Sequence, residues 1–367
     1  MQGMARLREM EMMEAAEQQP RSGGGAASAL PYIQSRVQDA GKIGVLIVNL
    51  GTPEATSYWP MRRYLREFLS DRRVIEVNPL LWQVILNVFV LSTRPKKSGE
   101  AYAKIWNRSR NESPLKTVTR AQAEKVAQRL AGVPGIVVDW AMRYGLPPIA
   151  ERLDHLVVQG CDRMLLFPLY PQYAAATTAT VQDKAFDALK TLRRQPALRT
   201  VPAYFDHPAY IDALAQSLQS HLQSLSWRPD KIIASYHGLP EDYVEKGDPY
   251  YEQCAATTRL LRERMGLGEG DLVMTFQSRF GRAEWIKPYT AETIADLPGQ
   301  GTKNLVVITP GFAADCVETL EEIAIGAAEI FHEAGGENFS VVPCLNDSDI
   351  SVEMLTTIIE DELQGWR

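Results

Sequence analysis

An uninterrupted apolar run near residue 42 constrains this chain more than any other feature. Residues 42–49 read Lys-Ile-Gly-Val-Leu-Ile-Val-Asn, with β-branched side chains and no alternation with polar ones. Such a run is typical of a parallel strand that is buried on both faces. Similar short runs recur at Ile136–Val138, Met164–Phe167, Ile232–Ala234, Leu272–Phe276, Leu305–Ile308 and Phe339–Val342.

Amphipathic helical patterns lie between these runs. Apolar residues share one helix face within Met61–Leu69, within Leu320–Phe331 and within Val352–Leu363. Strands that alternate with helices predict an α/β protein whose parallel sheets are covered on both faces. The length of 367 residues suits two such sheets.

Composition excludes several classes of protein. Four cysteines are too few for a disulfide scaffold, and their spacing gives no Cys-x-x-Cys metal motif. The 45 acidic residues outnumber the 39 basic ones, which argues against a nucleic-acid partner. No apolar run reaches the ~20 residues of a membrane span, and no apolar core of a secretory signal is found at the N-terminus. We therefore expect a cytoplasmic location.

Two segments depart from the alternating pattern. Residues 1–38 are rich in Met, Glu, Gln and Ala and then in Gly, which predicts a disordered tail. Residues 80–91 carry no charge, and basic residues follow at Arg94, Lys96 and Lys97. One interpretation of this segment is a buried helix. The other is an apolar lip beside a cleft, which dips into a membrane surface with its basic flank near anionic headgroups.

The residues that follow the predicted strands are the candidate site, because ligands of open α/β sheets bind beyond the carboxyl ends of the strands. These residues are rich in aromatic side chains and include one histidine and an acidic helix start, a combination that suits a flat, apolar, anionic ligand. Signatures of phosphate-binding loops, hydrolase elbows and HExxH zinc sites are absent from the sequence.

His237 and Glu318 are the side chains of these segments best suited to proton or metal chemistry. Of the five histidines, only His237 lies at the tip of a predicted strand; the alternative is a structural histidine. Glu318 begins a predicted helix, with Glu321 and Glu322 three and four residues on. The alternative for Glu318 is that its carboxylate only complements the helix dipole.

Taken together, the motifs at the strand ends resemble those of the ferrochelatases. They are Val48–Pro53, Tyr170–Tyr173, Ser235–Pro240, Gly247–Tyr250, Phe276–Arg279 and Asp315–Leu320, within a resemblance that covers residues 42–364. It implies two Rossmann-like lobes with parallel four-stranded sheets around a porphyrin cleft. It also implies insertion of ferrous iron into protoporphyrin IX, which gives protohaem and two protons. The alternatives are a chelatase for another tetrapyrrole and a non-catalytic tetrapyrrole or metal carrier.

The resemblance also implies a domain organisation. We expect an N-terminal lobe at 39–205 with the lip at 77–93, and a C-terminal lobe at 206–346. Residues 347–367 are expected to form a helix that packs back on the N-terminal lobe. Residues 80–91 are expected to touch a membrane surface, which suggests a peripheral position on the inner membrane. An upstream enzyme of haem synthesis is a candidate partner.

By resemblance, His237 is the catalytic histidine and Glu318 its partner acid, and both are expected to bind the metal. A porphyrin must lose two N–H protons as the metal enters, and an imidazole with a pKa near ~6.5 can accept one. A carboxylate can escort the cation or take the other proton. The division of these roles is left open. Glu322 is a weaker candidate for extending the metal entry path.

Further residues match positions that line the porphyrin cleft of the family. They are Leu50, Arg143, Tyr144, Trp285 and Phe312, with core packing as the alternative for the aromatic ones. Arg143 is expected to pair with a propionate or to support another group. No resident cofactor is expected: Fe²⁺ is a substrate, and the Cys-rich extension that holds an iron–sulfur cluster in some relatives is not found. Cys316 stands where some relatives have His, either as a bystander or as a residue that shifts metal preference towards Zn²⁺.

Overall fold

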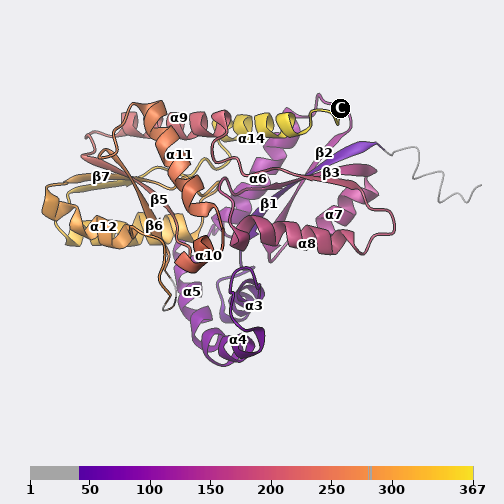
Figure 1. The fold of residues 1–367 in the computed structure, drawn as a ribbon, viewed down its shortest axis with the longest axis horizontal. Coiled ribbons are helices and arrows are strands. Elements are labelled where there is room, and N and C mark those ends of the chain that lie inside the picture. Colours follow the sequence, from indigo (N-terminus) through magenta and orange to yellow (C-terminus); the bar gives the residue numbers. More distant parts are fainter. Residues whose placement is uncertain (1–40, 280, 282, 367) are drawn as a thin grey trace, which may run out of the picture. The chain divides into compact units, whose positions relative to one another are not determined.

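A computed structural model describes residues 41–279, 281 and 283–366; the predicted tail at 1–38 lies outside them. The described residues form two four-stranded sheets with strand orders β2-β1-β3-β4 and β6-β5-β7-β8 (Figure 1). Every pair of neighbouring strands is parallel. The strands are β1 (Lys42–Gly51), β2 (Ile136–Tyr144), β3 (Cys161–Pro168), β4 (Ala197–Thr200), β5 (Lys231–His237), β6 (Leu272–Gln277), β7 (Asn304–Ile308) and β8 (Asn338–Val341).

Each predicted apolar run coincides with one of these strands, with Val342 one residue beyond the end of β8, so the predicted α/β fold with two parallel sheets is confirmed. The edge strand β4 has no counterpart among the predictions. Its four residues, Ala-Leu-Arg-Thr, are too short and too polar to form an apolar run.

Helices cover the sheets and form the connections between strands. They are α3 (Tyr58–Leu69), α4 (Pro79–Ile85), α5 (Leu91–Ile105), α6 (Pro114–Arg129), α7 (Ile149–Val158), α8 (Thr180–Leu189), α9 (Pro208–Ser224), α10 (Glu241–Glu245), α11 (Tyr250–Met265), α12 (Thr290–Asp296), α13 (Ala328–Glu333) and α14 (Asp349–Glu362). π-Helical segments occur at η1 (Leu86–Val90), η2 (Ala175–Ala179) and η4 (Glu318–Ala327), and a 3₁₀ turn at η3 (Pro298–Gln300).

One hydrophobic core is common to one face of both sheets. On β1, Val45 and Ile47 point into this core, whereas Leu46 and Val48 point into a separate core on the opposite face. Helices α6, α9, α11 and α14 cover the shared core, α7 and α8 cover the other face of the first sheet, and α12 and η4 cover that of the second. Alternate side chains of each central strand are thus buried in different layers, which explains the continuous apolar runs.

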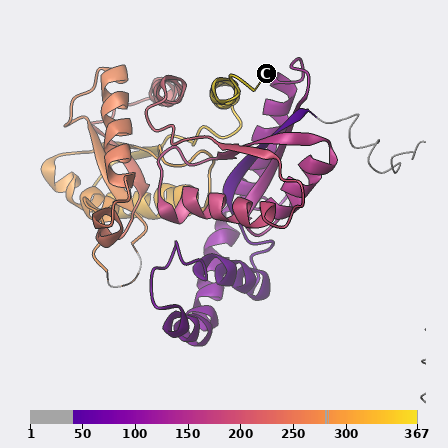
Figure 2. The same cartoon turned by 45° about the vertical axis from the view of Figure 1, so that its right-hand side comes forward.

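The C-terminal helix α14 packs against both α6 and α9, and it lies beside α9 over the two sheets (Figure 2). The C-terminal helix thus makes the expected contact with the N-terminal part of the chain, at α6. It also makes a contact with α9 that was not expected. The expected lobe boundaries after residues 205 and 346 stay predictions.

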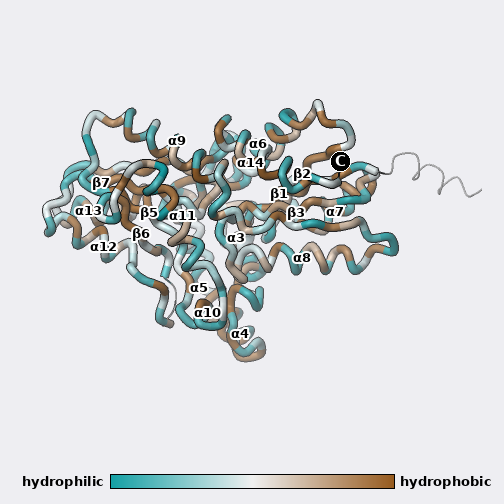
Figure 3. The backbone as a smooth tube through the Cα atoms, turned by 45° about the horizontal axis from the view of Figure 1, so that its top comes forward, coloured by the Kyte–Doolittle hydropathy of each residue, from teal (hydrophilic) through white to brown (hydrophobic). Residues whose placement is uncertain are grey.

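The apolar segment between β1 and β2 forms α4, η1 and the start of α5. Its outer side chains are exposed, with Leu80 at 83% and Phe89 at 65% of their full accessibility, while Leu86 and Leu91 point inward and are buried. The interpretation as a buried helix is therefore wrong for α4, which carries an apolar tip away from both sheets (Figure 3). Among the described residues, no helix combines the length and the apolar character that a membrane crossing requires.

Candidate active site

His237 is the last residue of β5, and its side chain is exposed. Its Nδ1 lies 2.7 Å from the Gly238 carbonyl oxygen. Because a carbonyl can only accept a hydrogen bond, Nδ1 carries the proton in the neutral ring. Nε2 is then left with its lone pair, so the geometry presents the basic nitrogen of His237 away from the backbone.

Glu318 begins η4, so the predicted helix is confirmed, and the structure shows that it is a π-helix as far as Ala327. The sequence does not indicate this helix type, because the apolar spacing of Ile323, Ala327 and Phe331 also fits an α-helix. π-Helical turns are rare and are frequently found at functional sites. The Glu318 carbonyl accepts a hydrogen bond from Gln277 Nε2 at 2.9 Å, which fixes the start of η4 on the end of β6.

Gln277 links this helix to the strand that carries His237. It is buried, it pairs with His237 in the register of β5 and β6, and its Oε1 accepts a hydrogen bond from Ser235 Oγ at 2.8 Å. Since Ser235 is two residues before His237 on the same strand, the amide of Gln277 joins β5, β6 and η4 directly beneath the histidine.

Glu322 is held by the turn that follows β6. Its carboxylate accepts a hydrogen bond from the Ser278 amide at 2.8 Å and a close one from Ser278 Oγ. Ser278 has φ +67°, a left-handed conformation that is uncommon for serine. Burial raises the pKa of Glu322; the hydrogen bonds from Ser278 and the charge of His237 oppose this rise, and the charge of Glu318 adds to it. Glu322 therefore lies within electrostatic range of both His237 and Glu318.

Glu321 is separated from this group. Its carboxylate forms an ion pair with Lys104 Nζ of α5 at 2.7 Å. No cluster of three or more His, Cys, Asp or Glu side chains suited to holding a metal ion is found among residues 41–279, 281 and 283–366.

Arg143 and Tyr144 lie at the end of β2 in the first sheet, where both bind Asp71. Tyr144 Oη donates to Asp71 Oδ2 at 2.9 Å, and the Arg143 guanidinium pairs with the same oxygen. Arg143 also donates from Nε to the Thr180 carbonyl at 2.9 Å and lies 4.2 Å from the centre of the Tyr144 ring. Tyr144 has no exposed surface, and burial raises its pKa. These contacts favour a supporting role for Arg143.

Leu50 and Phe312 are partly buried and contact the same small apolar cluster, which contains Leu115, Ala314 and Cys316. Burial raises the pKa of the Cys316 thiol well above its ordinary value. The charge of Glu318 adds to this rise, so the thiol lies close to Glu318 as well as to the apolar cluster.

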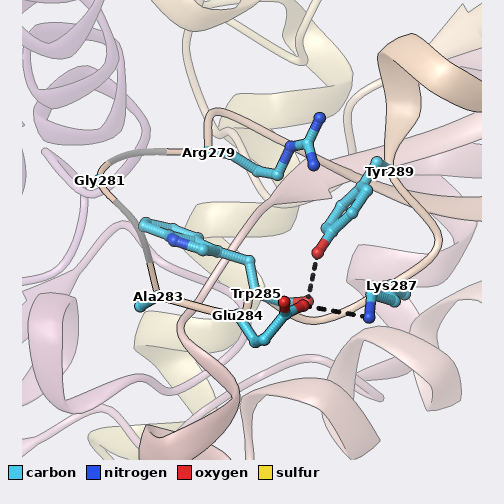
Figure 4. A pocket seen from close by; sticks show the side chains of 7 residues that line it. All are labelled: Arg279, Gly281, Ala283, Glu284, Trp285, Lys287 and Tyr289. Carbon is cyan, nitrogen blue, oxygen red and sulfur yellow. Dashed lines mark hydrogen bonds and ion pairs between the residues drawn. The ribbon is translucent and has the colours of Figure 1, made fainter.

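Trp285 lies beside the turn that follows His237. A Cβ atom on Gly238 would come within 3.0 Å of the Trp285 ring, so the close approach of this ring depends on glycine. Trp285 also lines a pocket of about 340 Å³ (Figure 4). Tyr289 Oη donates to the Trp285 carbonyl at 3.1 Å, and the Arg279 guanidinium lies 3.8 Å from the Tyr289 ring centre.

Three residues that organise the site have no predicted role in the sequence analysis. Gln277 and Ser278 lie within the motif Phe276–Arg279, which marks their position without indicating what they do. Asp71 follows α3, far along the chain from any predicted strand end, so no signal points to it.

Known structures resemble this chain in fold. SirB from Bacillus subtilis with Fe³⁺ matches with a TM-score of 0.53 and 11% identity, over 87% of this chain and 95% of that one. The sirohydrochlorin chelatase SirB from Bacillus subtilis subspecies spizizenii, in complex with cobalt, matches with a TM-score of 0.51 and 10% identity, over 88% and 97%. At such identities the likeness concerns the fold alone, and it agrees with the predicted chelatase-like arrangement.

Sequence comparisons are more specific. The ferrochelatase of Chelativorans sp. (strain BNC1) is 57% identical over 336 residues, which cover 92% of this chain and 95% of that protein. The ferrochelatase of Rhizobium etli is 59% identical over 327 residues, which cover 89% and 95%. That of Brucella ovis is 59% identical over 325 residues, which cover 89% and 92%. The family model described as Ferrochelatase matches residues 42–363, and the chain therefore belongs to the ferrochelatase family.

Proposed function

We propose that this protein is a ferrochelatase that inserts Fe²⁺ into protoporphyrin IX and releases protohaem and two protons, the last step of haem synthesis. Family membership supports the reaction. The observation that carries the proposal for the site is the convergence of a strand-end histidine with two acids of one π-helix, His237 with Glu318 and Glu322.

His237 is the proposed proton acceptor. Each pyrrole N–H that faces the incoming metal must lose its proton, and a neutral imidazole is a base that can take it. The hydrogen bond from Nδ1 to the Gly238 carbonyl orients the ring and leaves Nε2 as the acceptor. The exposure of this side chain gives the accepted proton a route to solvent.

Glu318 is the proposed partner in handling Fe²⁺, together with His237. A carboxylate and an imidazole bind ferrous iron, and a set of so few protein ligands releases it readily to the four nitrogens of a porphyrin. Glu322 is the proposed next carboxylate along the metal path, although both of its oxygens already accept hydrogen bonds from the Ser278 turn. Iron is here a substrate, and no resident cofactor or iron–sulfur cluster is proposed.

The proposed porphyrin contacts are Leu50, Phe312 and Trp285. Leu50 and Phe312 share one apolar cluster, and Trp285 lies against Gly238 beside the catalytic histidine. Arg143 and Tyr144 are proposed to support the residues that touch the porphyrin, because Asp71 already binds both of them.

The apolar lip is proposed to make peripheral contact with a membrane surface, on the cytoplasmic side of the inner membrane. Its exposed side chains lie on one short segment, and the basic residues Arg94, Lys96 and Lys97 follow. The exposed residues are Val77, Leu80, Leu81, Val84, Val88 and Phe89. The test is sedimentation with vesicles that contain anionic lipid. Replacing Leu80 and Phe89 together by serine should release the protein into the supernatant, and retention of that variant would contradict the contact. An upstream enzyme that delivers the porphyrin remains a proposed partner.

One assay distinguishes the proposed reaction from the other two functions considered. Purified protein is mixed with Fe²⁺ and protoporphyrin IX without oxygen, and haem absorbance is followed against a protein-free reaction. A ferrochelatase produces haem well above the protein-free rate. A carrier binds porphyrin or metal but gives no such increase. A chelatase for another tetrapyrrole gives no haem and instead metallates its own substrate, for which sirohydrochlorin with Co²⁺ is the probe.

A further inference from the structure

The short helix α10 holds the segment that leads into the apolar lip. Tyr243 Oη accepts a hydrogen bond from the Glu76 amide at 3.1 Å and donates one to the Val74 carbonyl at 3.2 Å. Lys246 Nζ lies 2.9 Å from Glu76 Oε2. The phenol of Tyr243 in α10 therefore binds the backbone of residues 74–76. The ammonium of Lys246, the C-terminal cap of α10, binds the side chain of Glu76. We call these two side chains, Tyr243 and Lys246, the latch.

The two side chains of the latch support each other. Tyr243 is buried, and Lys246 Nζ lies 5.2 Å from the centre of its ring, within the range of a cation–π contact. Lys246 also pairs with Asp242 at 2.9 Å, so the ammonium bridges α10 and Glu76. Without the phenol hydroxyl, a backbone donor and a backbone acceptor of the loop would both lose their partner, which is costly at a partly buried site.

On one side, the latch determines where the lip begins. Glu76 is two residues from Asn78, whose side chain caps α4 by accepting a hydrogen bond from the Leu80 amide at 3.1 Å. Trp82 Nε1 then donates to the Leu69 carbonyl at 2.6 Å, which fixes α4 on the end of α3. A displacement of residues 74–76 would therefore disturb the capped start of α4, while Trp82 holds the rest of that helix on α3.

On the other side, the latch is joined to the catalytic strand. Helix α10 begins four residues after His237. The intervening turn is bonded on both sides, since the Gly238 amide donates to the Gln277 carbonyl at 2.7 Å and the Ile286 amide donates to the Leu239 carbonyl at 3.0 Å. The lip and His237 are thus held at a defined separation through a path of hydrogen bonds.

We propose that Tyr243 is a positioning residue for the porphyrin: through the latch, it holds the lip relative to His237 in the arrangement that binds the flat macrocycle. The inference rests on the proposed function, because the macrocycle is its ligand. When a loop that was fixed samples other positions, the apparent dissociation constant equals the intrinsic one divided by the fraction of molecules that keep the competent arrangement. The chemistry at His237 is unaffected once the porphyrin is bound.

A second connection between the lip and the site is weaker. At the far end of α5, the ion pair between Lys104 and Glu321 joins the lip helix to η4. Both side chains are partly exposed to solvent, and such pairs contribute little to stability. The latch, with its buried phenol, is therefore the connection whose loss should be measurable.

The test compares Tyr243→Phe with Tyr58→Phe. Tyr58 Oη also donates to a backbone carbonyl, that of Leu91 at 2.9 Å, but this bond joins α3 to the start of α5 and does not involve α10. Tyr243→Phe should raise both the KM and the metal-free Kd for protoporphyrin IX by about tenfold, with kcat at saturation within twofold of the wild type. Tyr58→Phe should change these constants by less than twofold. Amide exchange should accelerate at residues 74–81 only in Tyr243→Phe, and it should remain slow in β5.

Two results would overturn the inference: an unchanged Kd for protoporphyrin in folded Tyr243→Phe, or a fall in kcat with an unchanged KM. If Tyr243→Phe fails to fold, Lys246→Met replaces it as the variant, with an expected rise in Kd of about threefold; an unchanged Kd then overturns it. Protoporphyrin binding is followed by fluorescence without metal, so the latch is tested independently of turnover. Absence of haem formation by the wild type would instead contradict the proposed reaction.

Discussion

The two sheets have the same strand order but very different carboxyl ends. In each sheet, the first strand along the chain lies between the second and the third, and the fourth pairs with the third, as the orders β2-β1-β3-β4 and β6-β5-β7-β8 show. At the end of the first sheet, Gly51 pairs with Tyr144, and the polar groups nearby bind one another. At the end of the second sheet, His237 pairs with Gln277 and remains exposed.

This difference teaches that the fold alone does not decide where chemistry takes place. In the first sheet, Asp71 neutralises Arg143 and binds Tyr144, so the charges there are used for packing. In the second sheet, Gln277 and Ser278 orient backbone and carboxylate groups and leave the imidazole of His237 available. Removal of a polar side chain at the carboxyl end of the first sheet should therefore reduce the stability of the fold. Removal of one at the carboxyl end of the second sheet should reduce turnover.

The largest effect is expected at the second sheet. His237→Ala should lower kcat for haem formation by about a thousandfold, because the proton acceptor is removed, while protoporphyrin binding stays within threefold of the wild type. The matched control is His155→Ala, which removes a histidine that pairs with Asp139 on the first sheet and should leave kcat unchanged. The measurement is the anaerobic haem assay combined with porphyrin fluorescence. Turnover near the wild-type rate in His237→Ala would remove this residue from its role.

The converse effect is expected at the first sheet. Asp71→Ala should lower the free energy of unfolding by about 3 kcal/mol, because it leaves the buried Arg143 guanidinium without its counter-charge. Urea denaturation followed by circular dichroism measures this loss, and His237→Ala serves as the comparison, with an expected change below about 1 kcal/mol. Equal losses of stability in the two variants would mean that the two strand ends do not differ in the way described.

A smaller effect, on the KM for Fe²⁺, is expected at Glu322. Glu322→Gln should raise the KM for Fe²⁺ by about tenfold, since a neutral amide replaces a carboxylate beside His237 and Glu318. Initial rates at saturating protoporphyrin and varied Fe²⁺ provide the measurement. An unchanged dependence on iron would reject Glu322 as part of the metal path.

The smallest effect is expected one residue earlier in the chain. Glu321→Gln removes a partly exposed ion pair with Lys104 and should change the free energy of unfolding by less than about 1 kcal/mol. Its KM for Fe²⁺ should equal that of the wild type, which makes it the matched control for Glu322→Gln. A raised KM in Glu321→Gln would show that the charge of the helix as a whole, and not the position of Glu322, governs iron binding.

Much of this fold can be predicted from the sequence for a simple reason. A strand buried on both faces needs a continuous apolar run, and Lys42–Asn49 shows one. The exposed edge strand β4 needs none, so its residues look like a loop. The π-helix at 318–327 is likewise hidden, because its buried residues Ile323 and Ala327 repeat every four positions, as they would in an α-helix.

The site divides in the same way. The position of His237 at a strand end can be predicted, because it depends only on the apolar run that precedes it in the sequence. The partnership of Asp71 with Arg143 cannot, because the two residues are 72 positions apart and meet only after folding. The exposure of Leu80 also depends on tertiary structure, since an uncharged helix of this length fits either a core or a protruding tip.

The position of α14 has a consequence for the order of events during synthesis. Leu355 and Ile359 are buried where α14 meets α6 and α9, although α6 ends at Arg129, more than two hundred residues earlier. Until α14 has left the ribosome, the part of α6 that meets α14 has no permanent cover, although β1 and β2 already cover the rest of its apolar surface. The first sheet therefore reaches its final packing only after residues 349–362 have been synthesised.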